Sequence, residues 1–327
     1  ARQEQYNEDF RRSLGLFQAG PGGFQSNDHD QIATGMTTGE AVFLGMLERS
    51  TARRAKLDRA YFFASKQMYE ECARLLNELH QEIRSGGGRV NQDGGMGSTR
   101  GCDREGDNSD NYDPEVAFLL GQLLLFGVGV PQDYSRGFHL TLDAAQSGYA
   151  PAFFDCGFCY YQGWGTLPDS REAEHWLNES LSKCSNPQSA IILGQMWLEN
   201  ETTLYSLEKI IEIIAWAINT LNQNPYKSSW LWLGQGYYVL GVIISEHKRD
   251  PETGVYHFTK SAELGNMWGQ NILGCACYHG QGCPVDKLQA AYWWKQAAMQ
   301  NCPEACWHLG LMYYQGDSVP EIGRAHV

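Results

Sequence analysis

The 327-residue chain has a formal net charge of −13, and 43% of its residues are hydrophobic against 19% charged, a balance typical of a folded protein. The excess of carboxylates repels phosphate backbones and no Lys/Arg run offsets it, which argues against nucleic acid as a partner. No stretch of about 18 apolar residues is present, so the sequence predicts no insertion into a membrane.

The N-terminal third contains three kinds of segment. Residues 1–35 hold scattered Gly, Gln and Asp, and we expect them to be disordered. Residues 36–84 have a helical pattern, and the part from Ala60 to Leu76 resembles a tetratricopeptide-type hairpin, which we expect to cap the fold. Residues 85–112 are rich in Gly, Asp, Asn and Ser and predict a flexible linker. Its glycines lack the strand, the helix and the Gly-Lys-Ser/Thr of a phosphate-binding loop.

An internal repeat occupies residues 113–320. An anchor glycine recurs every 36 to 40 residues, and in several units further glycines follow it after six and eight residues and an Asp after twelve. A period of this length indicates stacked helical hairpins, in which each unit buries its apolar face against its neighbours. The anchors are Gly121, Gly157, Gly194, Gly234, Gly274 and Gly310.

Each unit predicts a helix A, a turn and a helix B. The anchor Gly lets helix B approach helix A closely, at a helix-propensity cost of about 1 kcal/mol. The Gly-x-Gly segment supplies the left-handed backbone that ends helix A, and the Asp caps helix B. We expect Trp176 and Trp293 of helix B, with Tyr278 and Tyr314 of helix A, to fill the space between helices. The unit from Gly234 is expected to hold four extra residues in its loop.

The pattern Leu-Gly-x-x-x-Tyr-x-x-Gly-x-Gly-x-x-x-Asp-x-x-x-Ala-x-x-Trp-x-x-x-Ala-Ala resembles the Sel1-like repeat family, and residues 274–298 match it best. About six units fit; the third, from Gly194, is degenerate and the last is incomplete. The resemblance implies an all-α fold, a right-handed α/α superhelical solenoid of Sel1-like (TPR-like) helical hairpins. Residues 321–327 fit no unit and back-translate to a sequencing-library adapter, so we expect them to be an artefactual tail.

The same resemblance implies a non-catalytic adaptor or scaffold that binds a protein or an extended peptide on its concave face. Helix A lines that face in such solenoids, and the positions one and five residues after each anchor share one side of it. A partner would contact these positions, although polar residues that only face water would give the same pattern. The expected contact residues are Gln122, Phe126, Phe158, Gln162, Gln195, Glu199, Gln235, Val239, His279 and Gln315.

No catalytic residue, metal site or cofactor is predicted. The cysteines near His279 and His308 are better explained as small side chains at tight helix contacts than as zinc ligands. The Cys156-x-x-Cys159 pair lies inside helix A, away from the helix N-terminus where redox pairs occur. The alternative is that the repeats are the targeting region of a larger enzyme, for example linked to a ubiquitin ligase or a kinase, with its catalytic domain outside this sequence.

Ten cysteines without regular pairing favour reduced thiols and a cytoplasmic protein. A tetratricopeptide-like hairpin that leads into Sel1-like units also resembles the architecture of megalin-binding cytosolic adaptors, whose partners are receptor tails. Luminal adaptors of ER-associated degradation ligases carry these repeats too, so the ER lumen is the alternative if a signal peptide precedes Ala1. The sequence predicts no oligomeric state.

Overall fold

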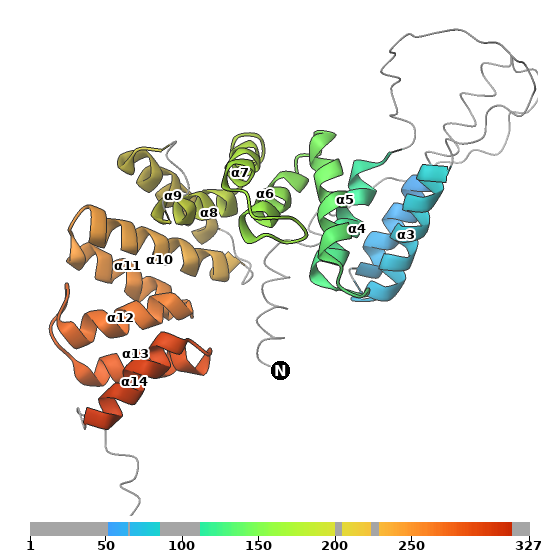
Figure 1. Cartoon of the computed structure of the whole chain (residues 1–327). Helices are drawn as coiled ribbons and strands as arrows, with labels where there is room; N and C mark the ends of the chain where they lie inside the picture. Colours follow the sequence, from blue (N-terminus) through green and yellow to red (C-terminus); the bar gives the residue numbers. More distant parts are fainter. Residues whose placement is uncertain (1–51, 65, 86–111, 200–204, 224–228, 316–327) are drawn as a thin grey trace, which may run out of the picture. The chain divides into compact units, whose positions relative to one another are not determined.

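The computed structural model describes residues 52–64, 66–85, 112–199, 205–223 and 229–315, and every regular element in them is an α-helix (Figure 1). The predictions for residues 1–35, for most of the linker and for the tail at 321–327 lie outside these residues. The described chain divides after residue 168 into two compact units. No helix in the described ranges has the length and apolar character needed to cross a lipid bilayer.

The N-terminal unit begins with a hairpin and continues with the repeats. A helix over residues 52–64 pairs with α3 (Tyr69–Ser85), where Nζ of Lys56 donates to Oε1 of Glu82 at 2.5 Å. It is followed by α4 (Pro114–Phe126), which packs against α5 (Tyr134–Gln146), and then by α6 (Ala152–Gln162), which packs against α5.

The C-terminal unit continues the series of hairpins. Helix α8 packs against α9, α10 against α11, and α12 against α13, while α8 also contacts α10 and α10 contacts α12. The A helices of this unit therefore lie side by side (Figure 1). The all-α stack of helical hairpins expected from the sequence is confirmed. The helices are α7 (Ser170–Cys184), α8 (Pro187–Leu198), α9 (Leu207–Asn222), α10 (Ser229–His247), α11 (Pro251–Glu263), α12 (Met267–His279), α13 (Lys287–Met299) and α14 (Pro303–Gln315).

The capping residues hold the predicted positions. Gly127, Gly163 and Gly280 end their A helices with φ of 62°, 71° and 70°, in the left-handed region that favours glycine. An Asp side chain accepts hydrogen bonds from free backbone N–H groups in the first turn of each following B helix, which offsets the unpaired donors there. These caps are Asp133, Asp169, Asp250 and Asp286.

The second glycine of each turn also contacts the preceding unit. A side chain there would collide with the backbone at the start of the preceding B helix, so the close approach requires glycine. The equivalent contact at α3 shows that the N-terminal hairpin stacks in the same register as the repeats. A Cβ on Gly129 would lie 2.3 Å from the carbonyl carbon of Tyr69. A Cβ on Gly165 would lie 2.1 Å from the backbone oxygen of Tyr134, and one on Gly282 would lie 2.2 Å from the backbone oxygen of Pro251.

The prediction that the unit of Gly234 holds its four extra residues in a loop is wrong. Helix α10 runs on to His247, and only residues 248–250 separate it from α11, so the extra residues lengthen the helix. No Gly-x-Gly follows Gly234, and nothing ends the helix where the other units end theirs. The close helix contact therefore occurs at Gly241, where a Cβ would lie 2.7 Å from the ring of Phe258.

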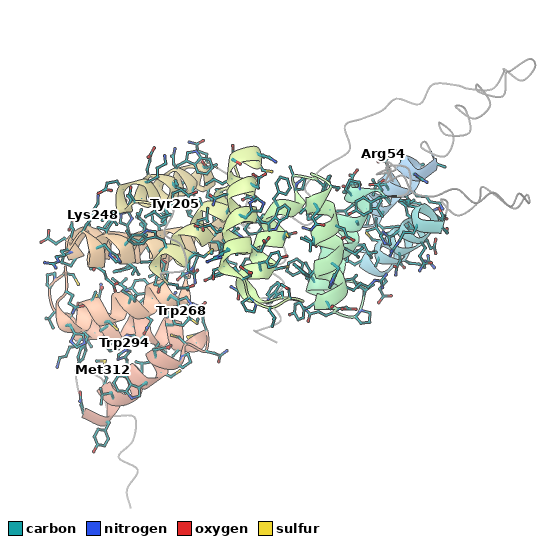
Figure 2. The ribbon with its side chains drawn as sticks, turned by 45° about the horizontal axis from the view of Figure 1, so that its top comes forward. Arg54, Tyr205, Lys248, Trp268, Trp294 and Met312 are labelled. Atoms are coloured by element: carbon teal, nitrogen blue, oxygen red, sulfur yellow. The ribbon has the colours of Figure 1, made fainter. Side chains whose placement is uncertain are left out.

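The aromatic residue buried in the core of the last hairpin is Trp294, whereas the predicted Trp293 only packs against that core. The Trp294 side chain is only 1% exposed and lies among α12, α13 and α14 (Figure 2), while Trp293 is half-buried. A Cβ on Gly274 would lie 2.6 Å from the indole of Trp294. In α7 the buried residue is likewise Leu177, next to the half-buried Trp176. One residue turns a side chain by about 100° around a helix, which decides between core and surface.

Helix α14 has one uncovered side within the described chain. A Cβ on Gly310 would meet nothing within 4 Å, in contrast to the anchors Gly121, Gly194, Gly234 and Gly274. Tyr314 is 90% exposed, so its predicted packing between helices is not observed. No described helix packs on that side of α14, whereas Met312 on the opposite side is buried in the core.

Candidate functional site

Polar side chains from neighbouring A helices form a hydrogen-bonded series on the predicted face. Nδ2 of Asn266 donates to Oε1 of Gln235 at 3.0 Å, and Nε2 of Gln235 donates to Oε1 of Gln195 at 3.0 Å. Nε2 of Gln195 then donates to Oε1 of Glu199 at 3.1 Å. We call Asn266, Gln235, Gln195 and Glu199 the amide chain. It links α8, α10 and the start of α12.

Asn266 has two roles in this arrangement. Its Oδ1 accepts from the backbone N–H of Gly269 at 2.9 Å and so caps α12, while its Nδ2 starts the amide chain. The capping bond fixes the orientation of the amide, which leaves the Nδ2 group directed at Gln235. Sequence reasoning missed Asn266. An Asn directly before a helix is a signal for the cap, but no local signal shows the second contact.

The corresponding place in the N-terminal unit is buried. Nε2 of Gln122 in α4 donates to Oδ2 of Asp155 in α6 at 2.7 Å, and the two residues are 3% and 5% exposed. Burial raises the pKa of the Asp155 carboxyl to about 7, and the hydrogen bond from Gln122 offsets part of that rise. Asp155 was not predicted as a site residue, although a carboxylate inside the apolar run of α6 is a visible signal.

Four of the predicted contact residues cannot lie on a binding surface, because Gln122, Phe126, Phe158 and Val239 are buried. Trp164, between the two glycines of its turn, covers both phenylalanines. Its ring centroid lies 5.9 Å from that of Phe126 and 5.3 Å from that of Phe158. The expected ladder is therefore interrupted, since side chains between packed helices are enclosed even when they occupy one side of each helix.

The remaining predicted residues reach solvent. Gln195 and Gln235 are half-buried within the amide chain. Four of the side chains five residues after an anchor are exposed and lie at the ends of α6, α8, α12 and α14 or just beyond them. One of them, Gln315, accepts a hydrogen bond at its Oε1 from the hydroxyl of Tyr278 at 3.5 Å. Their contact with a partner stays a prediction. These exposed residues are Gln162, Glu199, His279 and Gln315.

A cysteine and a histidine meet near the last hairpin. Sγ of Cys275 lies 3.5 Å from Nε2 of His308, whose ring stacks on Trp294 with centroids 4.7 Å apart. Burial raises the pKa of the Cys275 thiol and lowers the pKa of His308, so both groups favour their neutral forms and the thiol is not activated. In the part of the chain that the structure describes, no group of three or more His, Cys, Asp or Glu could hold a metal ion.

The amide chain gives a first prediction. Replacing Gln235 with Ala leaves Oε1 of Gln195 and Nδ2 of Asn266 without their protein partners, and we expect the free energy of unfolding to fall by about 1–2 kcal/mol. Urea titration followed by circular dichroism measures the change. The exposed Gln223, replaced in the same way, should shift the midpoint little. Equal effects of both substitutions would show that the amide chain adds no stability.

A family model matches the sequence pattern, and a solved structure shares the fold. A family model described as Sel1 repeat matches residues 114–149, 150–183, 233–266, 269–302 and 303–325. The crystal structure of a Sel1 repeat protein from Oxalobacter formigenes has a TM-score of 0.60 and 18% sequence identity, over 81% of this chain and 91% of that chain. A protective antigen of uropathogenic Escherichia coli that displays an SLR fold has a TM-score of 0.36 and 21% identity, over 65% of this chain and 51% of that chain.

The hairpin of α8 and α9 lies outside the matched segments, as the degenerate pattern of the third unit predicts. The Asp cap is replaced by Ser206, whose side chain accepts from the backbone N–H of Lys209 at 3.3 Å. Ile210 and Ile214 are fully buried, and the side chain of Ile214 lies against the anchor Gly194. A substitute cap and an apolar helix face therefore maintain the hairpin where the family pattern is lost.

Proposed function

Because this chain is a Sel1 repeat protein, we propose that it is a non-catalytic adaptor or scaffold that binds another protein or an extended peptide along its A helices. The amide chain is the observation that supports this function best. Its side chains are held in fixed orientations by hydrogen bonds that are present before any partner arrives. A preorganised polar surface loses less side-chain entropy on binding than a mobile one does.

We assign the contacts to the members of the predicted set that reach solvent. Glu199 offers a carboxylate at the end of the amide chain, while His279 and Gln315 extend the same row to α12 and α14. Amides and a carboxylate can pair with backbone N–H and C=O groups of an extended peptide, which gives affinity with limited sequence specificity.

Substitution of these exposed residues tests the proposal. A partner is first identified with the wild-type protein and its affinity is measured by titration calorimetry. We expect the combined variant Glu199→Ala, His279→Ala and Gln315→Ala to weaken that affinity at least about tenfold, because several direct contacts are lost together.

The matched control removes the same residue types from other exposed positions. Glu252, His175 and Gln223 are exposed and belong to, or directly follow, the B helices α11, α7 and α9. Their replacement with Ala should leave the affinity within about twofold of wild type, because surface positions away from the contact contribute little. A partner that binds both variants with the wild-type affinity would exclude the A helices as its binding site.

We propose the cytoplasm as the location of the protein, because the spacing of its ten cysteines shows no regular pairing. Among the described residues, the thiols of Cys72, Cys159, Cys277 and Cys302 are free and buried. Thiol titration of protein isolated from its native cell, denatured without reductant, should give ten reactive thiols per chain. A markedly lower number would favour the oxidising ER lumen.

A further inference from the structure

A cavity of about 670 Å³ opens between α3 and α5 in the N-terminal unit, away from the predicted A-helix contacts. Its volume lies in the range of ligand-binding pockets, which is roughly 300–1,000 Å³. Its wall includes His80 and Arg84 from α3 with Arg136, His139 and Asp143 from α5. In a chain of net charge −13, a wall with two arginines and one aspartate carries a local excess of positive charge.

The two arginines are available for a ligand. Within the described residues neither Arg84 nor Arg136 forms a salt bridge, and both are exposed. Nη2 of Arg136 donates to Oδ1 of Asn77 at 2.9 Å, which holds the guanidinium beside the cavity and leaves its other N–H groups unused by this contact. The cavity wall thus carries one cation from each of the two helices, and the hydrogen bond to Asn77 holds that of Arg136.

His80 lines the same cavity and is 8% exposed. Burial, with the positive charges of Arg84 and Arg136, lowers the pKa of its imidazole, while the carboxylate of Asp143 acts in the opposite direction. The neutral ring is therefore favoured in the free protein. It can still offer one N–H donor to a ligand that enters the cavity.

We propose that this cavity binds an anionic side chain of a partner peptide, a carboxylate or a phosphate, between Arg84 and Arg136. The planar guanidinium group donates two parallel hydrogen bonds to oxyanions of either kind. The proposal rests on the proposed function as a protein-binding scaffold, and it adds a second contact on the B helices that selects acidic partners.

Fluorescence polarisation with labelled peptides tests the site in the full chain. The probe is a Gly/Ser peptide that carries a run of glutamates, and the comparison peptides carry glutamines or phosphoserines at the same places. We expect the glutamate or the phosphoserine peptide to bind and the glutamine peptide not to bind. The variant Arg84→Gln with Arg136→Gln should weaken binding at least about tenfold, because two charge-assisted contacts are lost.

A second double variant controls for overall charge. Arg74 and Arg171 are exposed on α3 and α7, and neither lines the cavity. Their replacement with Gln changes the net charge equally and should leave binding within about twofold, since exposed distant charges are screened by salt. Equal losses in the two double variants would overturn the proposal, as would the absence of binding by both anionic peptides.

The comparison of the glutamate and phosphoserine peptides identifies the anion. Tighter binding of the phosphoserine peptide assigns a phosphate, and equal or tighter binding of the glutamate peptide assigns a carboxylate. The variant of Glu199, His279 and Gln315 should bind the anionic peptide as the wild type does, because these residues do not line the cavity. Failure of the A-helix proposal and failure of this site are therefore separate results.

Discussion

Gly282→Ala is expected to lower the free energy of unfolding of the C-terminal unit by about 2–5 kcal/mol, the sum of left-handed strain and overpacking. Gly282 has a φ of 75°, and a Cβ would lie 2.2 Å from the carbonyl oxygen of Pro251. A backbone atom cannot move aside as a flexible side chain can. The two neighbouring units would have to separate at the point where the turn of one meets helix B of the other.

Gly265 is a matched control in the same unit. Its φ is 85°, also left-handed, but a Cβ there would meet nothing within 4 Å. Gly265→Ala should therefore cost only the backbone strain, about 1–2 kcal/mol. The pair separates the contact between units from the conformational preference of glycine, and urea unfolding curves recorded by circular dichroism measure both. Equal losses at the two positions would show that the close approach adds no cost.

The N-terminal unit offers an independent repetition. Gly165 has a φ of 75° and a Cβ would lie 2.1 Å from the oxygen of Tyr134, whereas Gly148, with a φ of 86°, has open space around it. We expect the same order of effects from Gly165→Ala and Gly148→Ala. Agreement between the two pairs would show that the stack is held in register by backbone contacts at its turns, a constraint that extends to the hairpin before the first matched repeat.

The turns and caps were predictable because each favours a small set of residue types. A left-handed helix end favours Gly, and a free helix N-terminus favours Asp, so the spacing of Gly127 and Asp133 already defines a helix end and a helix start. The same logic explains the error at α10. In the unit of Gly234 the Gly-x-Gly is missing, and α10 continues to His247. Helix α8 also lacks it and ends at Leu198, so the missing glycines permit a longer helix but do not require one.

The candidate site was less predictable because its exposure depends on neighbouring helices. Helical periodicity places Gln122 and Gln235 at equivalent positions, yet the first is enclosed against Asp155 and the second is half-buried in the amide chain. The difference arises from which side chain the next A helix supplies. The long-range bond from Asn266 to Gln235 and the cavity that Arg84 and Arg136 both line are likewise products of stacking, not of local sequence.

Asp155→Asn should make the stability of the N-terminal unit less dependent on pH. The folded-state pKa of Asp155, about 7, lies above that of an unfolded Asp, near 4. Below about pH 4 the carboxyl is protonated in both states and imposes no penalty. As the pH rises towards 7 the unfolded chain releases its proton while the folded one retains it, so stability falls and then levels off above that pKa.

The expected difference between variant and wild type therefore grows with pH. The asparagine side chain resembles the protonated acid and keeps an oxygen that can accept from Nε2 of Gln122. Between pH 4 and pH 8 the variant should gain up to about 4 kcal/mol relative to wild type, by urea unfolding at each pH. Glu78→Gln removes one carboxylate from the exposed surface of α3 and should not reproduce this trend. A constant difference across the range would mean that Asp155 is ionised in the folded protein at neutral pH. Gln122 would then donate to a buried carboxylate whose pKa matches that of an unfolded Asp, and the polar contact between the first two A helices would add no pH dependence to stability.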